Sequence, residues 1–153
     1  NNENERYRDR ISSSKLGRYT IQREDVDQRI EGIVDNYNVL LDDCLKLNQY
    51  KKAEELLNEM KSKGMKPNPL SYNIVISTYI GADKIDEARR IFQEMISENV
   101  QPDIITFNHM IDGYLKANKF KDLEDIYLEM LSYGFEPDIV TYNSMIDGYM
   151  KSN

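Results

Sequence analysis

Four asparagines, spaced by 35 residues, are the side chains best suited to recognise another molecule. Each follows an aromatic residue, and the four are Asn38, Asn73, Asn108 and Asn143. An Asn amide carries hydrogen-bond donors beside an acceptor, so it can match a polar edge such as the Watson–Crick edge of a nucleobase. The same residues could instead cap helices or join neighbouring helices by hydrogen bonds. Either role requires a structural element that repeats every 35 residues.

The sequence contains no motif of a catalytic or metal site. A Gly-rich phosphate loop, a Cys/His metal spacing and a nucleophile motif are all absent. His109, the only histidine, follows one of the four asparagines, and we expect it to make a surface or inter-repeat contact. Cys44, the only cysteine, lies in an apolar run and is expected to be a small core residue. We therefore expect no enzyme activity, no cofactor, no metal and no small-molecule substrate.

The charge of the chain restricts how it could bind a polyanion. The net charge is −7, with seven basic and seven acidic residues in the first 33 and with 13 basic against 20 acidic in the rest. Phosphate contacts supply much of the affinity of nucleic-acid binders, so any such role needs basic residues placed locally. No run of about 18 apolar residues occurs, and a membrane is therefore not expected as a partner.

Apolar spacing predicts two amphipathic helices in each 35-residue block. In the second block, a first stripe with 3,4 spacing ends at Gly81–Asp83, and a second stripe runs from Ile85 to Met95. A fixed period of 20 to 50 residues is typical of solenoids. The sequence therefore predicts an all-α fold, an α-solenoid of helix-turn-helix repeats. Its three full repeats are residues 34–68, 69–103 and 104–138, and residues 139–153 supply the first helix of a fourth.

The first 33 residues do not follow this repeat. Residues 1–16 are polar and are expected to be a tail or disordered, with no initiator Met or apolar signal core. Val26, Ile30 and Ile33 are spaced for one helix face, and they predict a short helix that could cap the first repeat. At the other end, the last helix has no predicted partner, which indicates a fragment or a chain that continues.

The residues at equivalent positions of the repeats are also similar. Residues 104–116 read IITFNHMIDGYLK and residues 139–151 read IVTYNSMIDGYMK, while Met60, Met95 and Met130, and also Pro67, Pro102 and Pro137, recur in phase. Over about residues 34–153 the chain strongly resembles the pentatricopeptide repeat family of the plain 35-residue type. That family reads one RNA base per helical repeat through two or three side chains.

The resemblance assigns base-reading roles to named residues. One reader follows the aromatic of the first helix, and the other ends the repeat; the pairs are Asn38 with Asn68, Asn73 with Asp103, and Asn108 with Asp138, while Asn143 has no partner. In the family, Asn with Asp favours uracil and Asn with Asn favours a pyrimidine. The implied partner is a U- or pyrimidine-rich single-stranded RNA. The implied role is organellar RNA processing, stability or translation, in a mitochondrion or plastid.

Two further positions are implied by the same resemblance. An apolar residue wedges between successive bases, and it maps to Leu70, Ile105 and Val140, with Asp35 as a departure in the first repeat. Lys46, Lys116 and Lys151 share a phase that the family places near the RNA backbone, and the second repeat has Gly81 there instead. Lysine near a helix C-terminus is also favoured by the helix dipole alone.

A second hypothesis is a structural interaction subunit with little direct RNA reading. Such a subunit would contact proteins of a larger organellar assembly, such as a ribosome, a transcription complex or another ribonucleoprotein. The negative charge, Asp35 and Gly81 favour it. Carboxylates of the second helices, including Glu54 and Glu55, are expected to form a solvated outer face under both hypotheses.

Overall fold

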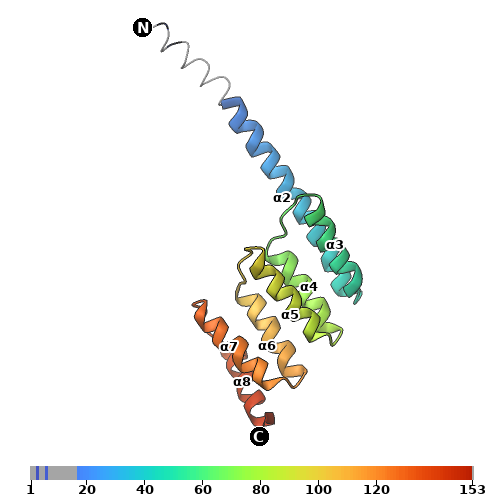
Figure 1. The fold of residues 1–153 in the computed structure, drawn as a ribbon, viewed down its shortest axis with the longest axis vertical. Coiled ribbons are helices and arrows are strands. Elements are labelled where there is room, and N and C mark those ends of the chain that lie inside the picture. The colour runs from blue at the N-terminus through green and yellow to red at the C-terminus, as the bar shows by residue number, and fades with distance from the viewer. Residues whose placement is uncertain (1–2, 4–5, 7–16, 153) are drawn as a thin grey trace. The chain divides into compact units, whose positions relative to one another are not determined.

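The structure, a computed structural model, describes residues 3, 6 and 17–152, and residues 17–152 form helices with no strand. The helices are α2 (Gly17–Lys46), α3 (Tyr50–Ser62), α4 (Pro69–Gly81), α5 (Ile85–Ser97), α6 (Ile104–Lys116), α7 (Phe120–Ser132) and α8 (Ile139–Ser152) (Figure 1). The predicted all-α class is confirmed. The tail expected at residues 1–16 lies outside the described residues, Glu3 and Arg6 excepted. No helix of the described part is long and apolar enough to cross a bilayer.

The chain divides into two compact units, residues 1–36 and 37–153, and helix α2 contributes to both. In the first unit, Val26, Ile30 and Ile33 are exposed on α2. The helix expected around these residues is present but is longer than expected, because α2 runs unbroken from Gly17 to Lys46. No proline interrupts that segment, and its internal glycine, Gly32, is accommodated within the helix. We call the second unit the array.

The array consists of helical hairpins stacked in chain order. Helix α4 packs against α5, and α6 packs against α7, which makes two complete hairpins. Helix α6 also packs against α4, α5 and α8, so each first helix bridges the repeats on either side of it. The first helices α4, α6 and α8 thus pack in succession, and each of the second helices α5 and α7 contacts the first helix of its own repeat and that of the next. The predicted solenoid of helix-turn-helix repeats is confirmed.

Residues in the left-handed conformation mark every turn between the described helices of the array. Asn48, Asp83 and Asn118, with φ of 56°, 59° and 57°, lie between the two helices of a repeat. Gly64, Asn99 and Gly134, with φ of 77°, 60° and 84°, lie between repeats. Glycine has no Cβ, and Asn and Asp tolerate this region better than other residues. The turn after α3 therefore uses Gly64, and the 35-residue period extends to the backbone geometry of the turns.

Three of the four aromatic residues that precede the asparagine row, Tyr37, Tyr72 and Phe107, belong to the core. Tyr72 and Phe107 are completely buried, and Tyr37 is nearly so. Met60, Met95 and Met130, which share the other conspicuous phase, are also completely buried. Cys44 is a buried core residue, as expected, and burial raises the pKa of its thiol. Many of the residues that recur every 35 positions are thus core residues that pack the helices together.

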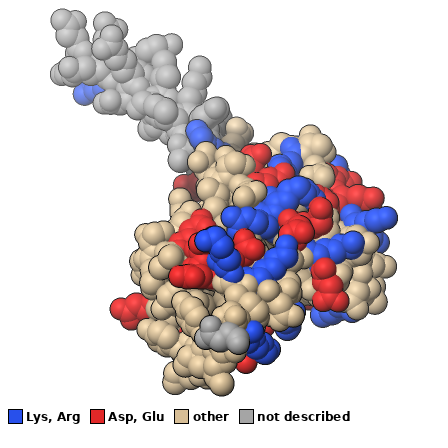
Figure 2. All heavy atoms as spheres, turned by 60° about the horizontal axis from the view of Figure 1, so that its bottom comes forward, with Lys and Arg blue, Asp and Glu red and all other residues tan. Residues whose placement is uncertain are grey.

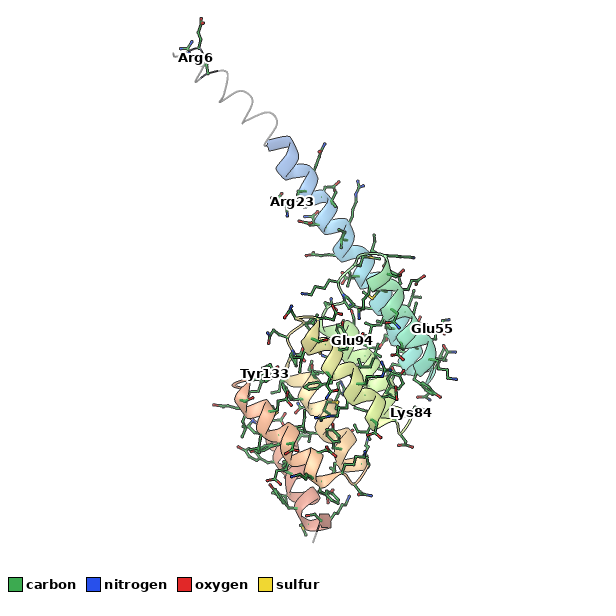
Figure 3. The ribbon with its side chains drawn as sticks, in the orientation of Figure 1. Arg6, Arg23, Glu55, Lys84, Glu94 and Tyr133 are labelled. Atoms are coloured by element: carbon green, nitrogen blue, oxygen red, sulfur yellow. The ribbon has the colours of Figure 1, made fainter. Side chains whose placement is uncertain are left out.

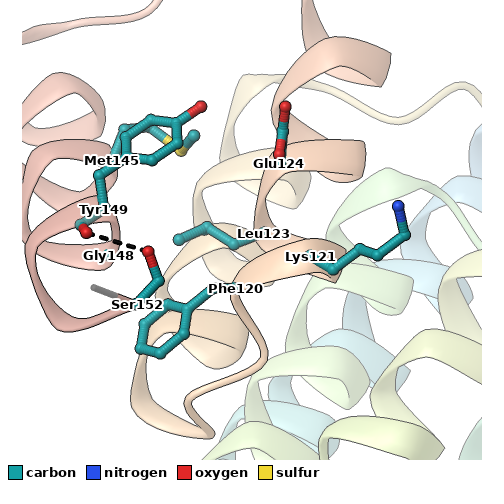
Figure 4. A pocket seen from close by; sticks show the side chains of 8 residues that line it. All are labelled: Phe120, Lys121, Leu123, Glu124, Met145, Gly148, Tyr149 and Ser152. Atoms are coloured by element: carbon teal, nitrogen blue, oxygen red, sulfur yellow. Dashed lines mark hydrogen bonds between the residues drawn. The ribbon is translucent and has the colours of Figure 1, made fainter.

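Helix α8 leaves exposed a surface that is covered in the earlier repeats. Tyr142 is 50% exposed and Ile146 is 57% exposed, whereas their equivalents Phe107 and Ile111 are 0% and 2% exposed. Leu123 points from α7 toward Gly148 of α8 beside a pocket of about 240 Å³ (Figure 4). A Cβ on Gly148 would lie 2.5 Å from the end of the Leu123 side chain, so the two helices approach closely there.

Polar side chains of the second helices link adjacent repeats. The Tyr79 hydroxyl donates to the Glu54 carboxylate, which also pairs with Arg90 at 2.5 Å. The expectation that Glu54 is merely solvated is wrong, because α4 and α5 bring these two partners to it. Its neighbour Glu55 is exposed, as expected (Figure 3). One repeat further on, Arg89 donates to the Tyr114 hydroxyl at 2.6 Å.

Two buried tyrosines differ in whether their hydroxyl is satisfied, and they should therefore respond differently to removal of that hydroxyl. The Tyr72 hydroxyl is buried with no hydrogen-bond partner in the described structure, whereas that of Tyr114 accepts from Arg89. We expect Tyr72→Phe to leave the free energy of unfolding unchanged or to raise it by up to about 1 kcal/mol. Tyr114→Phe should lower it by about 1–2 kcal/mol. Urea unfolding of both variants tests this, and an equal loss in the two would contradict it.

Candidate nucleic-acid interface

The sequence-predicted pairs lie at the junctions between successive first helices. Asn38 on α2 donates from Nδ2 to Oδ1 of Asn68 at 3.0 Å, and Asn73 on α4 donates to Oδ1 of Asp103 at 3.1 Å. Members of each pair are 30 residues apart in sequence, so the fold brings them together. Asn143 is exposed on α8.

The second member of each pair is also the residue that starts the next helix. Asp103 is the N-cap of α6: its Oδ1 accepts from the Thr106 backbone N–H at 3.0 Å, and its own N–H donates to the Thr106 hydroxyl at 3.1 Å. Asn68 and Ser71 form the same capping box at α4. Such reciprocal bonds satisfy amide groups that have no partner inside the helix. The capping role and the pairing role, posed as alternatives by the sequence, therefore coexist.

A buried hydroxyl completes each junction. The Thr106 hydroxyl lies 2.5 Å from Oδ1 of Asn73, and the Ser71 hydroxyl lies 2.6 Å from Oδ1 of Asn38. A hydroxyl has one proton, and these short distances favour donation to the amide oxygen. Each amide is thereby oriented, with Nδ2 toward the capping residue and Oδ1 toward the hydroxyl. Sequence reasoning missed these hydroxyls, although their phase, three residues after each cap, was visible.

The third junction is held by its hydroxyl alone. Thr141 lies 3.0 Å from Oδ1 of Asn108 and 2.9 Å from Oδ1 of Asp138, while Asn108 and Asp138 form no direct hydrogen bond in the described structure. The Thr141 backbone N–H also donates to Asp138 at 2.8 Å. These bonds lower the pKa of the Asp138 carboxyl, the backbone bond most strongly, and so favour its ionised form.

The capping residues differ in the atom that stays free. Oδ1 of Asp103 accepts from Thr106 and from Asn73, whereas its Oδ2 makes no hydrogen bond to any described residue. Asn68 also uses Oδ1 at its junction, so its second atom is Nδ2. Carboxylate oxygen only accepts, and an amide nitrogen only donates. The second junction thus presents an acceptor where the first presents a donor.

A groove of about 340 Å³ runs along the first helices at the second junction. Leu70 and Ile105, which the sequence analysis assigned as wedges, lie in it and are 54% and 53% exposed. The third such residue, Val140, is exposed on α8, and Asp35 is exposed on α2. The groove lining is Asp42, Leu45, Leu70, Asn73, Ile74, Ser77, Asp103, Ile105 and His109. It therefore brings together a complete pair and both flanking apolar side chains.

Each lysine of the predicted phosphate row has a carboxylate partner one turn earlier. Lys46 pairs with Asp42 at 3.1 Å, Lys116 with Asp112 at 2.9 Å and Lys151 with Asp147 at 3.1 Å. All six side chains are substantially exposed. Lys and Arg side chains likewise lie among Asp and Glu side chains on the face shown in Figure 2. The lysines are thus available at the surface, but locally neutralised.

The described residues contain no group of three or more His, Cys, Asp or Glu side chains placed to hold a metal ion. The interface is therefore built from amides, hydroxyls, carboxylates and apolar side chains. These groups can form hydrogen bonds to a planar polar ligand and cover its two faces.

The bridging hydroxyl can be tested by substitution. Thr106→Val keeps the shape of the side chain but leaves the buried Asn73 oxygen and the Asp103 N–H without their partner. We expect the free energy of unfolding to fall by about 1–3 kcal/mol. Thr106→Ser keeps the hydroxyl, as Ser71 does at the first junction, and should cost much less. Chemical denaturation measures both, and equal losses would show that the methyl group, not the hydroxyl, matters.

Comparisons with known proteins agree with this architecture. The PPR repeat family profile matches residues 34–79, 69–108 and 102–151. A crystal structure of PPR10 in complex with an 18-nt psaJ RNA element is similar over 78% of this chain, with 29% identity and a TM-score of 0.70. A crystal structure of PPR10 from maize is similar over 92% of this chain, with 27% identity and a TM-score of 0.70.

A more distant likeness supports the fold alone. The PPR domain of Arabidopsis thaliana protein-only RNase P 1, in complex with tRNA, is 11% identical, with a TM-score of 0.67 over 74% of this chain and 59% of that domain. The chain spans only 18% and 21% of the two PPR10 chains. No curated protein sequence matches it significantly. The repeated matches to the family profile cover most of the sequence, and the chain belongs to the PPR (pentatricopeptide) repeat family.

Proposed function

We propose that the array binds single-stranded RNA along its first helices, one base per repeat, with a preference for uracil and other pyrimidines. The observation that carries this proposal is the groove in which exposed Leu70 and Ile105 flank the Asn73–Asp103 pair. An oriented amide and a free carboxylate oxygen lie there between two apolar side chains. That arrangement suits a flat ligand with a polar edge.

The apolar side chains support a base rather than a phosphate as the occupant. Leu70 and Ile105 share one phase of the repeat, and more than half of each is exposed. Aliphatic side chains on both faces of a base remove its apolar surface from water. Successive bases would then alternate with these side chains along the array, with Val140 as the next in the row.

The free atoms of the junctions support the choice among pyrimidines. Uracil presents an N–H donor at N3, between two carbonyl oxygens, and Oδ2 of Asp103 is an acceptor with no partner among the described residues. Cytosine presents an unprotonated nitrogen at N3, which matches the donor that Asn68 offers at the first junction. The second and third repeats, which end in Asp, would prefer uracil. The first, which ends in Asn, would accept either pyrimidine.

A solved relative adds support. PPR10, at 29% identity, was crystallised with an RNA element. Because this chain covers less than a quarter of PPR10, its wider role is proposed from the family alone. That role is to block or remodel an organellar transcript, in a mitochondrion or plastid, with any chemistry supplied by partners.

The lysine row would contribute through phosphate contacts. Lys46, Lys116 and Lys151 pair with carboxylates in exposed ion pairs, and exposed pairs contribute little stability. A phosphate can therefore compete for each lysine at low cost. The second repeat, with Gly81, would lack this contact.

A protein-binding role is the second candidate. The observation that favours it is the acidic balance of the array, in which the lysines Lys46, Lys116 and Lys151 already pair with carboxylates. Under this alternative, the array would show no preference among short RNAs.

Selectivity at the second junction tests the RNA proposal directly. We expect the wild-type array to bind RNA with uracil at the position aligned with the second repeat about tenfold more tightly than RNA with cytosine there. Asp103→Asn should remove or reverse that preference, because it exchanges a free acceptor for a donor. The helix cap is retained, since Asn68 caps α4 in the same way. Fluorescence anisotropy with the two labelled RNAs gives the ratio.

Asp83→Asn is a matched control for this experiment. It makes the same charge change at a turn, where Asn48 and Asn118 already occupy the equivalent positions. The preference should survive in this variant. Undetectable RNA binding by the wild-type chain would instead favour the protein-binding role.

Salt dependence tests the lysine row separately. Three phosphate contacts on a single strand predict a slope of log affinity against log salt of about −2. Lys116→Gln should reduce the magnitude of that slope by about 0.7. Lys51→Gln, on the exposed side of α3, should leave the slope unchanged. Equal slopes for all three proteins would exclude Lys116 from the interface.

A further inference from the structure

His109 lies in the same groove as the Asn73–Asp103 pair, although neither the repeat pattern nor the base-reading positions include it. It follows Asn108 on α6 and stands four residues after Ile105. Side chains four apart on a helix are neighbours on one face. The imidazole therefore adjoins the apolar side chain against which the base of the second repeat would pack.

The histidine is chemically unlike the residues at the same phase of the other repeats. Those residues are Val39, Ile74 and Ser144, which offer two aliphatic side chains and one hydroxyl. A neutral imidazole offers one N–H donor and one acceptor nitrogen in a planar ring. Only the groove between the second and third repeats thus gains a heteroaromatic hydrogen-bonding group.

The ring nitrogens of His109 make no hydrogen bond to the described residues. The side chain is partly buried, and burial lowers the pKa of the imidazole, against the opposing effect of Asp112 and Asp103. The neutral form therefore prevails at neutral pH, with both ring nitrogens free for a ligand. The sequence analysis expected a surface or inter-repeat contact at His109, and no hydrogen bond joins its ring to another repeat among the described residues.

We propose that His109 is a third nucleotide-contacting residue of the second-repeat groove, which hydrogen-bonds the pyrimidine held between Leu70 and Ile105 by Asn73 and Asp103. The inference rests on the proposed RNA binding and sharpens it. Asn73 and Asp103 approach the base from the junction, whereas His109 approaches from the α6 wall. The second repeat would then select its base with three polar side chains, where the first repeat has two.

The sole histidine of the chain makes the contact directly observable. We expect the imidazole C–H resonances in the proton NMR spectrum to shift progressively as a short uracil-containing RNA is added, and to saturate with the binding curve measured by anisotropy. Unchanged resonances at saturating RNA would overturn the inference while leaving RNA binding intact. Absence of any binding would be a failure of the proposed function instead.

Substitutions separate the hydrogen bond from the bulk of the ring. His109→Phe keeps an aromatic ring without its nitrogens, and should weaken binding to the uracil RNA about three- to tenfold. His109→Gln keeps a donor and an acceptor, and should recover most of the affinity. Ser144→Ala, at the same phase of the fourth repeat, is the matched control and should bind as wild type. Wild-type affinity in His109→Phe would overturn the proposal.

Discussion

The first two junctions of the array each depend on one oxygen atom at the end of a repeat. Oδ1 of Asn68 or Asp103 caps the first helix of the next repeat and accepts a hydrogen bond from the Asn amide of its own repeat. A buried hydroxyl of the new helix also contacts it. The start of one helix and the orientation of the preceding amide are therefore fixed by the same atom. Neither can shift without leaving buried polar groups unsatisfied.

Under the proposed RNA binding, this shared atom limits how the chain can vary its base specificity. The residue that ends a repeat must begin a helix, and efficient N-caps are confined to Asn, Asp, Ser, Thr and Gly. Only an amide, a carboxylate, a hydroxyl or no side chain is therefore available to face a base at that position. Asn68 and Asp103 differ by a single atom, yet that atom changes a donor into an acceptor. Selectivity can thus change at a junction while its helix cap stays intact.

The sequence predicted the features that recur with the repeat. It missed the length of α2 and the side-chain contacts that form between repeats. The burial of Tyr72 and Phe107 follows from the 35-residue step, whereas the pairing of Asn73 with Asp103 was implied by the resemblance to the pentatricopeptide repeat family. The length of α2 follows from neither, because the repeat pattern ends where that helix continues. The lysines, their carboxylate partners and the bridging hydroxyls recur at fixed positions of the repeat, and this recurrence is visible in the sequence. Their geometry, however, appears only when helices from two repeats are placed side by side.

The negative charge of the array bears on selectivity as well as on affinity. With 13 basic and 20 acidic residues after residue 33, and with the lysines of the interface already paired, phosphate attraction is weak. Non-specific binding draws almost entirely on that attraction, whereas base contacts do not. A chain without a basic surface therefore loses more affinity for RNA of random sequence than for RNA whose bases form hydrogen bonds with its side chains. The acidic balance, which at first argues against RNA binding, is therefore compatible with an interface in which amides, carboxylates and apolar side chains do the discrimination.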